Sequence, residues 1–206
     1  MDMKFFNPKN HPLGDERNKR LSDVLQRRQP DLTIILDNVQ DPHNVAAVLR
    51  TCDAVGIMEI FLLNSGLPVP KRFNKRSSSG ANTWMLIHRF HDAQECFARV
   101  RQQVSKIYST KLGVESHDLY SLDFTEPIAL VFGNETLGVS DEVHALCDGN
   151  FNIPQMGMIK SLNISVACAV SLYEAYRQKN RAGHYDTYKL DETQEKRLLE
   201  FWKVKK

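Results

Sequence analysis

The chain has 206 residues, 42% of them hydrophobic and 25% charged, and its formal net charge is +2. This balance is that of a globular protein, and the length suits one domain better than two. No apolar run reaches the ~18 residues of a transmembrane helix, and the N-terminus lacks the apolar core of a signal peptide. We therefore exclude both and expect a cytoplasmic location.

The first part of the chain alternates between helical and extended patterns. Residues 1–14 show no periodicity and predict a loose arm. Apolar periodicity and β-branched runs then predict a basic helix at 15–28, a buried strand at 32–37, a helix at 41–56 and a second strand at 59–63. The segment 64–83 is rich in Gly, Ser, Pro and basic residues, and it predicts mostly loop.

The same alternation continues to the C-terminus. The predicted elements are a strand at 84–90, a helix at about 92–104, strands at 106–110 and 127–133, a helix that Ser140 caps, a strand at 151–154, a helix at about 161–178 and an amphipathic helix within 187–206. Strands that alternate with helices predict an α/β fold with a mostly parallel sheet flanked by helices.

Positive charge is concentrated in short clusters along the chain. These are RNKR at 17–20, the arginine pair at 27–28, KRFNKR at 71–76 and KVKK at 203–206. Clustered Lys and Arg side chains contact phosphates in nucleic-acid-binding proteins. Each cluster alone fits a solvated surface equally well, but together they favour a nucleic-acid partner.

The cysteines and histidines form no pattern typical of disulfides or metal sites. Cys52, Cys96, Cys147 and Cys168 are scattered without a C-x-x-C pair, which predicts free thiols. Two of the seven histidines lie three residues apart, but no cysteine or carboxylate set completes a site there. We therefore expect no bound metal.

The standard glycine-rich nucleotide motifs are absent from the sequence. It contains no G-x-G-x-x-G, no G-x-x-x-x-G-K-[ST] and no G-x-S-x-G. Their absence argues against a dinucleotide site of the standard kind, a P-loop NTPase and a serine hydrolase.

Three clusters of small and polar residues offer a different site. The first pairs Asn44 with Arg50, the second spans 133–138, and the third is IPQMGMIKSLNISVA at 153–167. The carboxyl ends of parallel strands meet at one edge of a sheet, and α/β proteins bind ligands there. The order of the clusters after successive strands therefore favours one common site.

Each cluster also has a purely structural interpretation. Gly133 fits a turn glycine, Glu135 fits a solvated acid, and Ser161 or Asn163 fits a helix N-cap.

Three segments resemble the motifs of one family. In order, DPHNVAAVLRTCDAVG at 41–56, VFGNETLGVS at 131–140 and IPQMGMIKSLNISVACAVSLYEA at 153–175 are similar to the three motifs of the SpoU class of RNA ribose 2′-O-methyltransferases. The resemblance covers almost the whole chain. Within this class, RRQPDLTI at 27–34 is most similar to the tRNA (guanosine-18) enzymes.

The resemblance implies a domain organisation and a set of partners. It implies a methyltransferase domain at 31–180 whose C-terminal part forms a deep trefoil knot, an N-terminal arm and basic helix at 1–30 that contact RNA, and a helical extension at 181–206. It further implies that S-adenosyl-L-methionine binds in the knot through main-chain contacts. The implied substrate is tRNA, and the implied assembly is a homodimer with active sites near the subunit interface.

The resemblance also gives roles to individual residues. The catalytic set comprises Asn44, Arg50, Glu135, Ser161 and Asn163. The cofactor contacts comprise Thr110, Gly133, Ile153, Met158 and Leu162. The candidates for tRNA contact comprise Arg17, Arg20, Arg28, His43, Arg177 and Lys179.

The role of Arg50 is a question of proton transfer. A ribose hydroxyl must lose its proton to accept a methyl group, and the family scheme gives this step to Arg50. Guanidinium groups rarely deprotonate in proteins, and an adjacent phosphate makes deprotonation harder. We therefore expect Arg50 to anchor a phosphate and orient the ribose. The structural alternative is an ion pair with Asp53, three residues further on.

Two other functions compete with methylation of guanosine-18. One is 2′-O-methylation of another site, in rRNA or at the wobble position of tRNA. The rRNA enzymes usually carry a separate N-terminal domain, whereas the wobble enzymes usually lack both terminal extensions. The other is a non-catalytic RNA-binding module, which would have no affinity for the cofactor.

Overall fold

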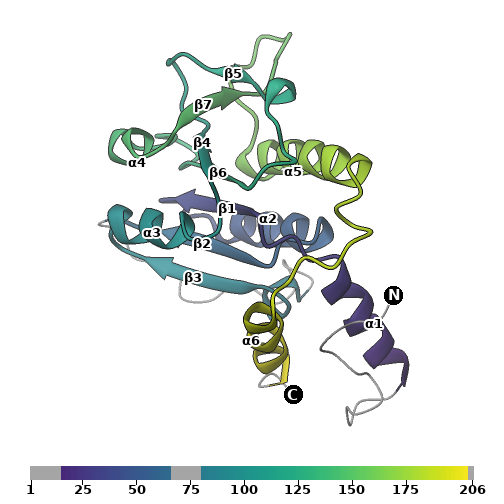
Figure 1. Cartoon of the computed structure of the whole chain (residues 1–206). Helices are drawn as coiled ribbons and strands as arrows, with labels where there is room; N and C mark the ends of the chain where they lie inside the picture. Colours follow the sequence, from purple (N-terminus) through teal and green to yellow (C-terminus); the bar gives the residue numbers. More distant parts are fainter. Residues whose placement is uncertain (1–14, 66–79, 204–206) are drawn as a thin grey trace.

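The computed structural model describes residues 15–65 and 80–203, with side chains from 19 to 65 and from 80 to 202 (Figure 1). The α-helices are α1 (Asp15–Gln26), α2 (Pro42–Ala54), α3 (Ala93–Val100), α4 (Asp141–Ala145), α5 (Ile164–Arg181) and α6 (Glu192–Lys203). The strands are β1 (Leu32–Asp37), β2 (Glu59–Leu63), β3 (Leu86–Phe90), β4 (Lys106–Ser109), β5 (His117–Asp118), β6 (Ile128–Phe132) and β7 (Gly149–Asn152). Short 3₁₀ turns are η2 (Ala81–Thr83) and η3 (Leu119–Ser121). Among the helices in this part of the chain, none is both long and apolar enough to cross a membrane.

The strands form one seven-stranded sheet in the order β3-β2-β1-β6-β4-β7-β5, and every strand pairing that the structure describes is parallel. The prediction of an α/β fold with a mostly parallel sheet is confirmed. Strand β1 is buried along its whole length because helices cover both faces of the sheet. Leu32, Ile34 and Leu36 pack with the residues of α2 and α5, whereas Ile35 packs with those of α3 and α4.

Several boundaries differ from those predicted. Helix α3 ends at Val100 because residues 101–103 form turns, although Val104 beyond them is buried. Strand β7 begins at Gly149, two residues earlier than expected. Strand β5 was not predicted because its two residues are polar and exposed, so they carry no apolar pattern. The predicted arm at 1–14 and most of the predicted loop at 64–83 lie outside the described residues.

Side-chain caps determine where helices α4 and α5 begin. Ser140 Oγ accepts from the backbone N–H of Val143, which confirms the predicted N-cap of α4. Asn163 Oδ1 accepts from the backbone N–H of Ser165, so α5 begins at Ile164, three residues later than predicted.

The terminal segments share an apolar cluster that is separate from both faces of the sheet. Leu25 from α1 and Trp202 from α6 are buried together with Met58 and Leu86. The indole Nε1 of Trp202 also donates to the carbonyl of Trp84 at 3.2 Å. Figure 1 shows α1 and α6 at the end of the molecule away from β5 and β7. Both terminal helices therefore pack near the amino ends of strands β2 and β3.

A buried carboxylate attaches α6 to the sheet. Glu59 in β2 is 2% exposed and pairs with Arg99 Nη2 at 3.1 Å and Arg197 Nη2 at 3.2 Å. Its Oε2 also lies 2.6 Å from His88 Nε2. Burial raises the pKa of Glu59, but the hydrogen bond with His88 and the charges of Arg99 and Arg197 outweigh it. The pKa of Glu59 therefore lies below its ordinary value.

We expect Glu59→Gln to lower the unfolding free energy at neutral pH by about 3 kcal/mol, because Arg99 and Arg197 would lose a buried partner. In the wild type, the contribution of Glu59 is present above the ordinary glutamate pKa of about 4.3. It is lost as the pH falls through the lower pKa of the folded state. The stability of the wild type should therefore fall more steeply in acid than that of the variant.

Urea unfolding at neutral pH and at pH ~3.5 measures both effects. Glu200→Gln is the matched control, because Glu200 lies on α6 and is exposed. Equal stability losses in acid for the wild type and Glu59→Gln would contradict the role assigned to Glu59.

Candidate cofactor and RNA site

A cavity of about 620 Å³ lies at the carboxyl ends of β4, β6 and β7. Three stretches of chain line it, within residues 110–116, 132–139 and 151–167. This is the edge of a parallel sheet at which α/β proteins bind ligands. Of the residues predicted to contact the cofactor, four line the cavity, namely Thr110, Gly133, Ile153 and Leu162.

The loop after β6 folds back so tightly that position 133 must be glycine. Asn134 and Gly138 exchange two backbone hydrogen bonds of 3.1 and 2.9 Å. A Cβ atom on Gly133 would lie 2.1 Å from the carbonyl carbon of Gly138 and 2.2 Å from the amide nitrogen of Val139. Gly138 itself has a φ of +71°, a conformation that favours glycine. Gly133 is therefore both a turn glycine and part of the cavity wall.

The polar residues of the three motifs meet beside the cavity. Asn44 Nδ2 donates to Glu135 Oε1 at 2.8 Å, and Asn163 Nδ2 donates to Asn44 Oδ1 at 3.3 Å. These contacts fix the amide of Asn44, because its NH₂ group faces a carboxylate and its oxygen faces a donor. Ser161 lies close by in the cavity wall. Asn44 lies 91 residues before Glu135 and 119 residues before Asn163 in the sequence, and the fold brings these three side chains into one polar cluster.

Arg50 lies on α2 with its side chain exposed, and it forms no hydrogen bond or ion pair within residues 15–65 and 80–203. The alternative ion pair with Asp53 is wrong, because Asp53 Oδ1 accepts from Arg28 Nη2 at 2.8 Å. An exposed guanidinium of this kind can pair with a phosphate of a bound substrate.

The prediction that Arg28 contacts RNA is wrong, because its side chain is fully buried. Besides Asp53, its guanidinium donates to the carbonyls of Ile57 at 2.8 Å and Trp84 at 3.1 Å. It also lies 6.0 Å from the ring centre of Trp202. Burial lowers the pKa of Arg28 and the charge of Asp53 opposes this shift. Arg28 therefore connects the segment after α1 to α2 and α6 rather than contacting a substrate.

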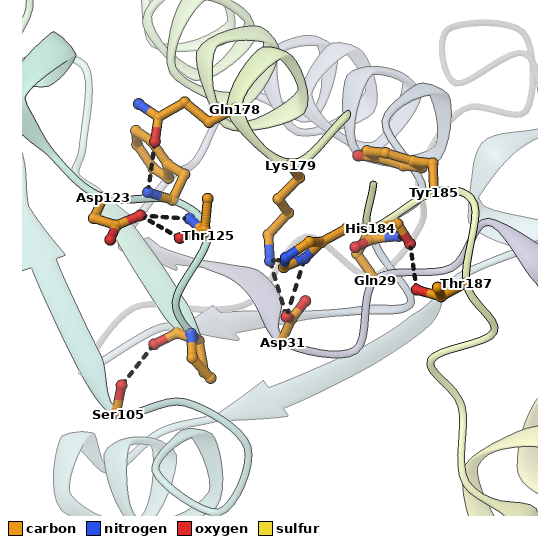
Figure 2. A network of polar contacts seen from close by, with 12 residues as sticks. Gln29, Asp31, Ser105, Asp123, Thr125, Gln178, Lys179, His184, Tyr185 and Thr187 are labelled. Atoms are coloured by element: carbon orange, nitrogen blue, oxygen red, sulfur yellow. Dashed lines mark hydrogen bonds and ion pairs between the residues drawn. The ribbon is translucent and has the colours of Figure 1, made fainter. Parts of the chain in front are cut away.

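The prediction that Lys179 contacts RNA is wrong for the same reason. Figure 2 shows its side chain pointing from α5 toward Asp31 and His184. Lys179 is fully buried and its Nζ lies 2.9 Å from Asp31 Oδ2. Burial lowers the pKa of Lys179, and the charge of Asp31 opposes this shift. Burial and the charge of Lys179 also lower the pKa of His184, which favours a neutral imidazole beside the ion pair.

We expect Lys179→Met to lower the unfolding free energy by about 3 kcal/mol, because it leaves Asp31 without its cation. The affinity for tRNA should change less than about twofold, because no phosphate contact is lost. Arg177→Ala should instead weaken tRNA binding and its salt dependence, because the Arg177 side chain is 59% exposed. Urea unfolding and filter binding at two salt concentrations measure these effects. A Lys179→Met variant of normal stability with weak tRNA binding would restore the original prediction.

The remaining predicted residues are Met158 and three candidates for RNA contact. Met158 is 98% exposed and lies outside the cavity wall, so the prediction that it lines the cavity is wrong for this chain. Arg20 on α1 and His43 at the start of α2 are both exposed. Arg17 lies in α1, but its side chain is outside the described part.

Sequence reasoning missed Lys111, which joins two walls of the cavity. Its Nζ donates to the carbonyl of Val139 at 2.9 Å and pairs with Asp141 Oδ1 at 2.8 Å. The hydrogen bond from Lys111 lowers the pKa of Asp141. A lysine just after a predicted strand end was the signal that could have identified it.

The four cysteines are all free thiols. Within the described ranges, the structure contains no group of three or more His, Cys, Asp or Glu side chains that could hold a metal ion.

Comparison with known proteins gives relatives over nearly the whole chain. Residues 31–173 match the SpoU rRNA Methylase family. The chain is 44% identical over 188 residues to the tRNA (guanosine(18)-2'-O)-methyltransferase of Thermus thermophilus, covering 91% of this chain and 96% of the relative.

Two crystal structures extend this comparison to the fold. The A. aeolicus TrmH/SpoU tRNA modifying enzyme matches with a TM-score of 0.85 and 35% identity, over 93% of this chain and 97% of that chain. The SpoU methyltransferase AviRb from Streptomyces viridochromogenes, in complex with the cofactor AdoMet, matches with a TM-score of 0.65 and 30% identity, over 75% of this chain and 62% of that chain. The chain therefore belongs to the SpoU rRNA Methylase family.

Proposed function

We propose that this protein transfers a methyl group from S-adenosyl-L-methionine to the ribose 2′-hydroxyl of guanosine-18 in the D-loop of tRNA. The observation that carries the proposal is the polar cluster of Asn44, Glu135 and Asn163 beside the cavity. Family membership supports the methyltransferase class. The name of the Thermus thermophilus relative supports the choice of guanosine-18.

The cavity fits S-adenosyl-L-methionine in size and in lining. Its volume of about 620 Å³ falls within the ~300–1,000 Å³ of small-molecule sites. Because Gly133 has no side chain, its backbone atoms form that part of the cavity wall directly. Ile153 and Leu162 offer apolar surface for a purine ring. The AviRb complex supports use of this cofactor within the family. When bound, the cofactor supplies a methyl group that is activated by a sulfonium sulfur.

The residues around the cavity position the acceptor. Glu135 and Asn163 hold the amide of Asn44 from two sides, so this side chain is fixed before the substrate arrives. Arg50 binds a phosphate of the substrate and orients the ribose beside the cavity. Its positive charge also stabilises the negative charge that develops as the hydroxyl loses its proton. The proton leaves to water or another group, because a guanidinium retains its own.

We further propose that the protein acts as a homodimer. Leu137, Met156 and Met158 are 83%, 95% and 98% exposed, and all three lie in the segments that form or border the cavity. Such a concentration of exposed apolar side chains is typical of a surface that another protein covers. A second copy would cover it and bring the two active sites near the subunit interface.

The knot, the domain limits and the location of the protein also form part of this proposal. The family resemblance supports a deep trefoil knot in the C-terminal part of the domain at 31–180, with extensions at 1–30 and 181–206. A tRNA substrate supports a cytoplasmic location.

Methylation of unmodified tRNA with labelled cofactor tests the proposed function. We expect one 2′-O-methyl group per tRNA, and nucleoside mapping should place it at guanosine-18. A methyl group at another position would overturn the assignment of the site but keep the reaction class. No methylation, together with no cofactor affinity by calorimetry, would favour a non-catalytic RNA-binding module.

A further inference from the structure

The connection between β4 and β5 crosses the strand that separates them. Strand β7 pairs with β4 on one side, where Ser109 lies opposite Asn150, and with β5 on the other side, where His117 lies opposite Phe151. Residues 110–116 therefore pass from one side of β7 to the other. Parallel strands usually need a crossover of about a dozen residues or more. A connection this short forms no strand of its own, so its backbone polar groups need other partners.

The side chain of Asn150, in β7, supplies hydrogen-bond partners for backbone groups of the connection. It is 3% exposed, its Oδ1 accepts from the backbone N–H of Lys111 at 2.8 Å, and its Nδ2 donates to the carbonyl of Lys111 at 2.8 Å. The same Nδ2 donates to Ser116 Oγ at 2.7 Å, and Ser116 in turn donates to the carbonyl of Val114 at 2.9 Å. Asn150 therefore holds the connection near both of its ends.

The neighbours of Asn150 allow only one orientation of its amide. A flipped amide would turn its NH₂ toward the N–H of Lys111 and its oxygen toward the carbonyl of Lys111. Ser109 Oγ also donates to Asn150 Oδ1 at 2.7 Å and lies 2.8 Å from His144 Nδ1. Because the hydroxyl has one proton, His144 is the donor in that contact. The amide is therefore fully hydrogen-bonded, and this network is buried under the connection.

We infer that Asn150 is a positioning residue for cofactor binding, which holds the connection at 110–116 in place as one wall of the cavity. Six of the lining residues come from this connection, whereas Asn150 itself is not part of the lining. Leu112 at the centre of the connection is 63% exposed, so the connection has little apolar burial to hold it. The inference rests on the proposed function, because it takes the ligand to be S-adenosyl-L-methionine.

The test is Asn150→Ala, with calorimetry for S-adenosyl-L-methionine and steady-state kinetics on tRNA. We expect the Kd and the KM for the cofactor to rise about tenfold or more, because the competent conformation of the connection becomes a minor population. At saturating cofactor, kcat and the KM for tRNA should stay within about threefold of the wild type. A purely structural role would instead lower the amount of folded enzyme and leave the KM for the cofactor unchanged.

Two further variants complete the experiment. Asn180→Ala is the matched control, because Asn180 is exposed near the end of α5 farthest from the cavity, and its cofactor affinity should equal that of the wild type. Asn150→Ser keeps a hydroxyl that can donate one hydrogen bond, so it gives a smaller rise in Kd and serves if Asn150→Ala does not fold. Wild-type affinity in a folded Asn150 variant would overturn this inference but not the proposed function. No affinity in the wild type would instead overturn the proposed function.

Discussion

Replacing Arg50 with alanine is expected to lower kcat/KM for tRNA methylation by about a thousandfold, the loss typical when a charge-stabilising group is removed. The reason is that the Arg50 side chain is exposed and forms no ion pair in the described part of the chain, so its charge is free for the substrate. Cofactor affinity should change little, because Arg50 is not in the cavity wall. Lys106→Ala is the control, since this exposed lysine lies at the opposite, amino end of β4.

The variant Arg50→Lys separates the two roles considered for this residue. A phosphate anchor keeps its charge in the variant but loses its bidentate contact, so activity should fall about 10- to 100-fold with an unchanged pH profile. A general base would behave differently, because the activity of the variant would rise in alkali with a limb near the ordinary lysine pKa of about 10.4. Such a limb in the pH profile of kcat would refute the phosphate-anchor role.

Replacing Gly133 with alanine is expected to weaken cofactor binding by more than about 100-fold. The new Cβ would lie 2.1 Å from the carbonyl carbon of Gly138, and a backbone atom cannot move aside without opening the 133–139 loop. Overpacking of this kind should also lower the unfolding free energy by about 2–3 kcal/mol. Calorimetry and urea unfolding measure the two effects.

The same substitution at a spacious position provides the control for folding. Gly157→Ala should change the unfolding free energy of the subunit by less than about 0.5 kcal/mol, because no heavy atom of the same chain outside residues 156–158 lies within 4 Å of the position that the new Cβ would take. Normal cofactor affinity in Gly133→Ala would mean that the tight loop is not part of the binding site.

Much of the fold could be predicted because its strands are buried on both faces. The run LTIILD in β1 is buried at all six positions and has no polar face, so its apolar pattern is unambiguous. The two-residue strand β5 lacks any such pattern, and it could not be predicted because its pairing with β7 depends on the crossing connection.

The polar cluster could be predicted from the sequence, whereas the burial of Arg28 and Lys179 could not. Asn44, Glu135 and Asn163 each follow a strand, and the ends of parallel strands meet in space. Arg28 and Lys179 look like surface cations in the sequence. Their carboxylate partners, Asp53 and Asp31, become neighbours only in the folded chain. Neither local composition nor the family resemblance reports such tertiary pairs, so the burial that excludes the implied RNA contacts of both residues could not be predicted.

The cluster that joins Leu25, Met58, Leu86 and Trp202 has a consequence for synthesis of the protein. Leu25 and Trp202 lie 177 residues apart in the sequence, so the cluster cannot close until the ribosome has released the segment that contains Trp202. Until then, α6 does not cover Met58 and Leu86 on the nascent chain, and the apolar surface that it leaves open can bind chaperones. A ribosome-bound chain that stops before α6 should therefore associate with chaperones more strongly than the finished protein does.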